Sequence, residues 1–236
     1  MSASIKQAVA VAINSSAAQF SVTLPGVTAG NTIVVIVANG DLGTPIASLS
    51  DGTNTYTLET TLNYGPGVIY GYAFVAQNVA SGSFTIVSNV SNCDYPFGIA
   101  IEIQGVTTTP LDGHTGVVQS APGAGTNALT VGPPSPNNTH TPALVLAVAM
   151  DVTPGGSGDG NPSAGTGYTL YNVYNPWGHA GNSIAVESRL LSSGTSSAAT
   201  FTVGSPGNGN YCQYELIFDQ AAAAPTGNVL LDAMDA

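Results

Sequence analysis

The four glutamates are the side chains of this sequence best suited to acid–base chemistry: Glu59, Glu102, Glu187 and Glu215. Glycoside hydrolysis needs two carboxyl groups, one acting as an acid and the other as a nucleophile or base. Glu102 stands between two isoleucines and Glu215 follows a tyrosine, so both could face a groove in a sheet. Polar positions on the solvent face of a sheet are the commoner arrangement. We therefore expect no enzymatic activity.

Nucleophilic and metal chemistry have weaker signals. His114, His140 and His179 are scattered among Gly, Pro and Thr residues, and the sequence has no G-x-S-x-G motif. Cys93 and Cys212 stand before matching strands and do not suggest a zinc site, which needs several converging ligands. They form one disulfide or stay as two buried thiols. The sequence thus predicts no catalytic residue, no metal site and no cofactor.

A glycine-rich loop is the one segment with oxygen ligands for Ca²⁺. It carries Asp151, Asp159 and Asn161, but their spacing fits the calcium-loop pattern poorly. A loop without a metal ion is the alternative.

Aromatic residues cluster just after that loop. Tyr171, Tyr174 and Trp177 are candidate glycan-binding residues, with Tyr171 and Trp177 forming the stacking platform. They could equally be core residues or anchors of a protein interface, where Tyr and Trp are enriched.

The only arginine, Arg189, stands two residues after Glu187, so both side chains lie on one face of a strand. An exposed ion pair there would contribute only about a few tenths of a kcal/mol. Arg189 is therefore also a candidate contact with another subunit.

The charge balance excludes several classes of partner. The 236 residues include 2 Lys and Arg against 13 Asp and Glu, a net charge of −11. Two cations cannot neutralise a nucleic-acid backbone or hold the chain on an anionic membrane surface. The longest apolar run, Ala143–Met150, is too short to cross a bilayer. We expect no nucleic-acid and no membrane partner.

Alternating and β-branched segments, separated by Gly, Pro, Asn and Asp, predict an all-β fold. The predicted strands are Gln7–Ile13, Phe20–Leu24, Thr32–Ala38, Tyr56–Glu59, Val68–Ala76, Ser83–Ser88, Phe97–Ile103, Ala128–Val131, Ala143–Met150, Tyr168–Val173, Ser183–Leu191, Ala199–Val203 and Tyr211–Phe218.

Two sets of these strands match in order, which predicts an internal duplication of about 110 residues. Thr32–Ala38 corresponds to Ala143–Ala149, and Cys93 followed by Ile99–Gln104 corresponds to Cys212 followed by Leu216–Gln220. The halves span about 15–110 and 125–220, preceded by an N-terminal strand or arm (1–14) and followed by a C-terminal tail (221–236). Each half alone would leave one apolar sheet face uncovered. Packing these two faces together would form one hydrophobic core and give a jelly-roll-like β-sandwich.

Several turn motifs carry a family resemblance. They are Thr28-Ala29-Gly30-Asn31, Ser50-Asp51-Gly52-Thr53-Asn54-Thr55-Tyr56, Ala76-Gln77-Asn78-Val79 and Pro110-Leu111-Asp112-Gly113. With them, most of residues 15–220 resembles jelly-roll-like β-sandwich proteins of bacteria and bacteriophages. The resemblance implies a secreted module or a virion structural protein. We read no signal peptide, which favours the virion.

The expected function is therefore that of a bacteriophage virion structural protein, namely a capsid decoration or cement protein on the particle surface. Its expected partners are the major capsid protein or other virion subunits, with homo-oligomers. Apolar residues of the tail are the candidate interface: Val229, Leu230, Leu231 and Met234. The alternative is an extracellular carbohydrate-binding or adhesion module, on a phage fibre or a cell surface.

Overall fold

The computed structural model confirms the all-β prediction. It describes residues 2–13, 16–40, 45–63, 69–90, 93–120, 128–134, 137–152, 162–174, 183–203 and 210–222. The strands are β1 (Ser4–Ala12), β2 (Ser16–Ala18), β3 (Ser21–Val27), β4 (Thr32–Gly40), β5 (Leu49–Ser50), β6 (Thr57–Asn63), β7 (Ile69–Ala76), β8 (Gly82–Ser88), β9 (Cys93–Gln104), β10 (Val106–Ser120), β11 (Ala128–Val131), β12 (Ala143–Asp151), β13 (Thr169–Tyr174), β14 (Ser183–Leu191), β15 (Ala199–Thr202) and β16 (Asn210–Gln220). Within these ranges no helix is long and apolar enough to cross a membrane.

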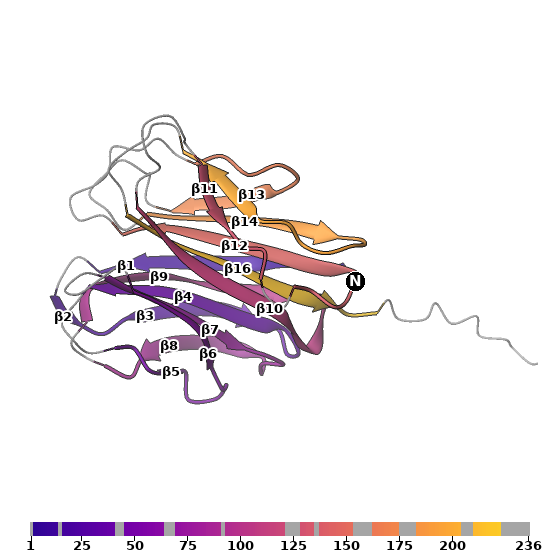
Figure 1. Ribbon diagram of the computed structural model, residues 1–236. Coiled ribbons are helices and arrows are strands. Elements are labelled where there is room, and N and C mark those ends of the chain that lie inside the picture. Colours follow the sequence, from indigo (N-terminus) through magenta and orange to yellow (C-terminus); the bar gives the residue numbers. More distant parts are fainter. Residues whose placement is uncertain are drawn as a thin grey trace, which may run out of the picture.

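The described residues form four antiparallel sheets, which stack as layers (Figure 1). Sheet A has the order β1-β9-β4-β7-β6, with β2 also paired to β9, and sheet B has the order β3-β8-β5. Sheet C has the order β10-β16-β12-β14-β13, and sheet D is β11-β15. Sheets A and B belong to the first half of the chain, and sheets C and D to the second.

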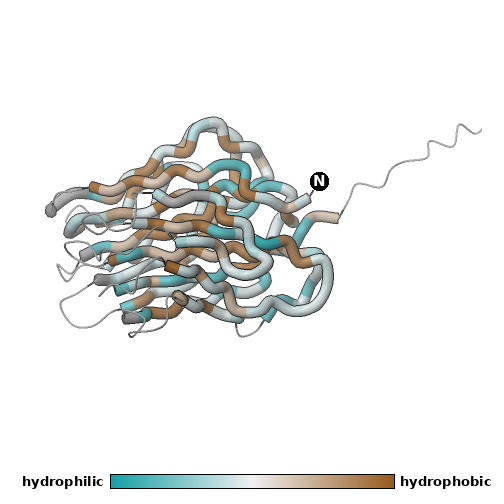
Figure 2. The backbone as a smooth tube through the Cα atoms, turned by 90° about the horizontal axis from the view of Figure 1, so that it is seen from above, coloured by the Kyte–Doolittle hydropathy of each residue, from teal (hydrophilic) through white to brown (hydrophobic). Residues whose placement is uncertain are grey.

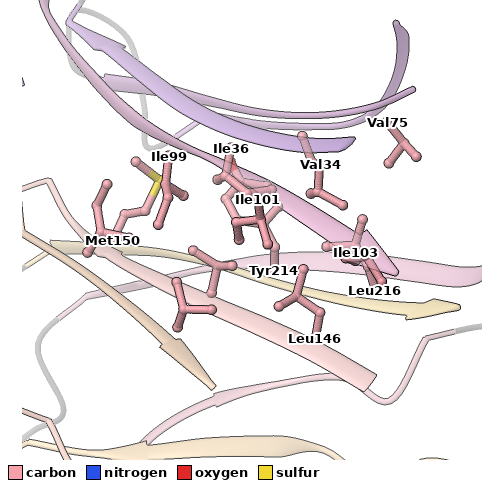
Figure 3. Close-up of a cluster of buried hydrophobic side chains, with 14 of the residues drawn as sticks. Val34, Ile36, Val75, Ile99, Ile101, Ile103, Leu146, Met150, Tyr214 and Leu216 are labelled. Carbon is pink, nitrogen blue, oxygen red and sulfur yellow. The ribbon is translucent and has the colours of Figure 1, made fainter. Parts of the chain in front are cut away.

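In the described part of the chain, three hydrophobic cores lie between these layers, where the sequence predicted a single core between the halves. One core fills the space between sheets A and B, and another the space between sheets C and D. The third joins sheets A and C, where Val34, Ile36 and Ile101 face Leu146 and Tyr214 (Figure 3). The central strands are therefore buried on both faces, which explains their continuous apolar sequences.

The two halves have corresponding strand orders. Sheets A and C have the same strand order when each strand is matched with a counterpart: β1 with β10, β9 with β16, β4 with β12, β7 with β14 and β6 with β13. The residue offset expected from sequence does not hold, however. Val34 faces the core between sheets A and C, whereas Val145, its expected counterpart, faces sheet D. A one-residue shift reverses every side chain of a strand. The duplication itself stays a prediction.

β1 and β10 lie at corresponding edges of sheets A and C. The predicted N-terminal arm forms β1, which pairs with β9 at the edge of sheet A. β10 pairs with β16 at the edge of sheet C, although the sequence predicted no strand there. Its segment contains proline and two glycines and lacks the continuous apolar run of a central strand such as β12. Figure 2 shows such hydrophobic stretches, in brown, along the stacked backbone. An edge position tolerates the β10 sequence because one side of the strand needs no ladder partner.

Candidate functional site

Two glutamates lie side by side in the interior of the second half. Glu187 of β14 and Glu215 of β16 both pair with Ala147 of the intervening strand β12. Their Cα atoms are therefore about 10 Å apart, two strand spacings. Both residues are 0% exposed. The solvent-facing position expected from sequence is wrong for Glu215, and for Glu102 of β9, which is equally buried.

Glu187 is incompletely hydrogen-bonded. Its Oε2 accepts a hydrogen bond from the backbone N–H of Gly165 at 2.8 Å. Its buried Oε1 has no hydrogen-bond partner among the described residues. Burial raises the pKa of Glu187 to about 7; the Gly165 N–H and Arg189 act in the opposite direction, whereas the charge of Glu215 adds to the rise. A large fraction of Glu187 is thus protonated near neutral pH.

Glu215 is held by the loop before β15. Its carboxylate accepts hydrogen bonds from the Ser196 hydroxyl at 2.6 Å and from the Ala199 N–H at 3.3 Å. Burial raises its pKa, and these hydrogen bonds limit the rise. A Cβ atom on Gly132 would lie 1.8 Å from Glu215 Oε2, so this close approach requires glycine.

Arg189 lies on the same face as Glu187, as predicted, but no ion pair within 4.0 Å joins them in the described part of the chain. Its guanidinium stacks over the Tyr168 ring, 4.7 Å from the centroid, and Nη1 donates to Ser197 Oγ at 3.3 Å. Cation–π stacking holds the guanidinium in place without a carboxylate partner.

An open pocket of about 440 Å³ lies over this stack. It is lined by Ala164, Gly165, Thr166, Tyr168, Arg189, Ser197, Ala198, Thr200 and Thr202. Glu187 and Glu215 are not among these residues, because Gly165 and the loop before β15 cover them. The pocket therefore offers hydroxyl groups and a guanidinium to a ligand, rather than a carboxyl pair.

The other predicted site residues are not brought together in the described part of the structure. Tyr171 is 43% exposed on edge strand β13, whereas Tyr174 packs against the core between sheets A and C. Trp177 lies outside the described residues, as do the tail residues Val229, Leu230, Leu231 and Met234. Of the loop expected to bind Ca²⁺, Asp151 is buried at the end of β12, and the other two candidates lie outside the described residues.

Glu102 differs from Glu187 in that both of its carboxylate oxygens accept hydrogen bonds. Its oxygens accept hydrogen bonds from Lys6 Nζ at 3.1 Å, Gln7 Nε2 at 2.5 Å, the Thr28 N–H at 2.8 Å and Asn31 Nδ2 at 2.6 Å. Burial acts to raise the pKa of Glu102, but these hydrogen bonds outweigh it and the pKa is lowered. This carboxylate is ionised and ties β1 to the turn before β4.

The histidines have acidic neighbours that the sequence did not reveal. His114 Nε2 lies 3.5 Å from Glu59 Oε2, between β10 and β6. His140 lies between Asp112 and Asp219. These three residues come from three distant segments of the chain. No spacing signal could have found this cluster, since the pairing of β10 with β16 creates it. His179 lies outside the described residues.

The two cysteines are free and buried, which settles the alternatives left by the sequence. Cys93 lies in the core between sheets A and B, and Cys212 in the core between sheets A and C. Burial raises the pKa of Cys212 to about 12, so its thiol stays protonated and unreactive.

The turn motifs behind the family resemblance have a structural explanation. Asp51 accepts hydrogen bonds from the N–H groups of Thr53 and Asn54 and from the Tyr56 hydroxyl, and Gly52 has a φ of +79°. The Ser50–Tyr56 motif therefore encodes a turn before β6. Comparison with family models, curated proteins and solved structures finds no match to this chain.

Proposed function

We propose that the chain is a non-enzymatic bacteriophage virion protein, a capsid decoration or cement protein on the particle surface. The observation that supports this most is the free edge of β1. This nine-residue strand pairs with β9 on one side, and no other described strand pairs with it. An unpaired edge is a template for a strand from another chain.

Natural proteins usually protect such an edge with charge, proline or a bulge. The sequence of β1, SIKQAVAVA, contains no proline, and its only charge is Lys6. That ammonium group is turned back to Glu102 and to the Gly26 carbonyl. The register shift between Ile5 and Gln7 leaves the following Ala–Val segment regular. We assign this segment as the contact with a neighbouring capsid subunit.

The charge distribution fits an exposed coat. Both cations are engaged within the fold, Lys6 with Glu102 and Arg189 with Tyr168 and Ser197. The outer surface is left to neutral and acidic groups, which repel DNA and anionic membranes. The partners are then the major capsid protein, other virion subunits or further copies of this chain, bound through main-chain hydrogen bonds and apolar burial.

We further propose that each half is a jelly-roll unit and that the pair arose by duplication. The corresponding orders of sheets A and C support this, as does the pairing of β3 with β8 and of β11 with β15. Packing of the two units through sheets A and C makes a rigid four-layer body suited to bracing a shell.

Immunogold electron microscopy on particles from the source culture tests the location. Gold over phage heads supports decoration; gold confined to tail tips, to cell surfaces or to the medium contradicts it.

Hydrogen exchange then tests the contact made by β1. Amides on the free edge of β1 should exchange quickly in the isolated chain and slowly in the particle, and equal rates would contradict the edge assignment. Deletion of residues 223–236 asks whether incorporation also needs the tail.

A glycan-binding module is the second candidate, favoured by Tyr171. This ring is exposed on an edge strand, and the pocket lined by hydroxyl groups and Arg189 lies in the same half. Titration of host polysaccharide should then quench the fluorescence of Trp177, and Tyr171→Ala should weaken the effect. Saturable binding that survives in Tyr171→Ala would place the glycan elsewhere.

A further inference from the structure

Asp112, His140 and Asp219 form a cluster that the proposed function does not use. Asp112 lies in β10, Asp219 near the end of β16, and His140 in the loop before β12. One ligand atom from each lies within 4.8 Å of the others. The cluster combines an imidazole nitrogen with two carboxylates, a donor set that suits Zn²⁺ better than Ca²⁺, which takes oxygen ligands.

Two of the ligand separations fit a tetrahedral site. His140 Nδ1 lies 3.5 Å from Asp112 Oδ1 and 3.2 Å from Asp219 Oδ2. Two ligands of a tetrahedral zinc ion, each about 2.0–2.1 Å from the metal, are about 3.3 Å apart. The ligand atoms of all three residues lie within 4.8 Å of one another, so a single ion could contact them after adjustment of the side chains.

Asp112 is positioned before any ion binds. It is the extra residue of a bulge in β10, because Leu111 and Gly113 pair with consecutive residues of β16. Bulges turn a side chain away from its regular direction. The Asp112 carboxylate also accepts hydrogen bonds from the N–H and hydroxyl groups of Thr139 and from the N–H of His140. These contacts fix both Asp112 and the backbone of His140.

The Asp219 carboxylate has one oxygen atom without a partner. Its Oδ1 is buried, and no described residue forms a hydrogen bond with it. Two carboxylates in contact repel each other, and one imidazole supplies at most a single positive charge. A divalent cation would neutralise both carboxylates.

We propose that Asp112, His140 and Asp219 bind a divalent transition-metal ion of the Zn²⁺ class. The His140 side chain is 68% exposed, so the cluster opens to solvent and a water molecule can fill the fourth position. The ion would clamp edge strand β10 to β16 and to the loop before β12. Its role would be structural, adding stability to the second half where an edge strand meets a loop.

The test is isothermal titration of the full chain with ZnCl₂ after removal of metal by a chelator, together with melting curves. We expect about one Zn²⁺ per chain and a rise in Tm. His140→Gln is the main variant, because this exposed side chain can change without disturbing a core; it should weaken binding at least about tenfold and abolish the rise in Tm. Asp219→Asn should do the same.

His114→Gln is the matched control. His114 lies on β10, as Asp112 does, and beside the acidic residue Glu59, but it is outside the cluster. It should bind Zn²⁺ as tightly as the unchanged chain. The proposal is overturned if the unchanged chain binds no Zn²⁺, or if His140→Gln binds it equally well. Stabilisation by Ca²⁺ to the same extent as by Zn²⁺ would also overturn it. A site proven by these variants stands whatever the location of the protein in a particle.

Discussion

The sharpest prediction concerns Glu187, whose replacement by glutamine should make the protein more stable at alkaline pH. Glu187→Gln keeps the size of the side chain and its hydrogen bond to the Gly165 N–H but removes the ionisable group. The native carboxyl is buried, has one oxygen without a partner and has a pKa raised to about 7. Ionising it in the folded state is therefore unfavourable.

The sign and size follow from linkage between proton binding and folding. Below pH 4.5 the carboxyl is mainly protonated in both the folded and the unfolded chain, so its raised pKa causes no loss of folding stability there. Between pH 4.5 and about 7 the unfolded chain releases the proton first, and stability falls. The shift corresponds to about 3 kcal/mol by pH 8. Glutamine avoids this loss of stability, but its unpaired amide group costs about 1 kcal/mol, which reduces the net gain.

Urea unfolding at pH 4.5, 6, 7 and 8 measures the effect. Glu187→Gln should match the native chain within about 1 kcal/mol at pH 4.5 and exceed it by about 2 kcal/mol at pH 8. Glu102→Gln is the control with the opposite sign, because the pKa of Glu102 is lowered and its ionised form is stabilising. That variant should be less stable at pH 7, with a deficit that shrinks on acidification. Parallel stability curves for Glu187→Gln and the native chain would contradict a raised pKa of Glu187.

Three further substitutions test the packing and the buried ion pair by urea unfolding at pH 7. Lys6→Met removes the cation beside buried Glu102 and should cost about 1–3 kcal/mol; a change below about 0.5 kcal/mol would contradict the ion pair's importance. Tyr214→Phe removes a buried hydroxyl without a described partner and should be neutral or stabilising. Gly71→Ala places a Cβ 2.2 Å from that hydroxyl and should cost about 2 kcal/mol, less in the Tyr214→Phe background; an equal cost in both backgrounds would show that the clash lies elsewhere.

Much of the strand pattern was predictable because alternation and β-branched residues are local signals. Ala128–Val131 and Ser183–Leu191 have the predicted bounds, and Thr32–Ala38 lies within β4. β10 escaped prediction because its Pro, Gly and His residues carry no such signal; it is a strand only because β16 offers it a ladder. The single predicted core became three, since strands buried on both faces require a layer on each side.

The fold class, the scarcity of cations and the shared face of Glu187 and Arg189 follow from composition and strand period, which are properties of the chain alone. The burial of Glu187 and Glu215 on either side of Ala147 depends instead on how the strands pair and the sheets stack. The same holds for the meeting of His140 with Asp112 and Asp219. Burial and the meeting of distant residues depend on which sheets stack and in what register, and these are set by long-range pairing that no short segment encodes.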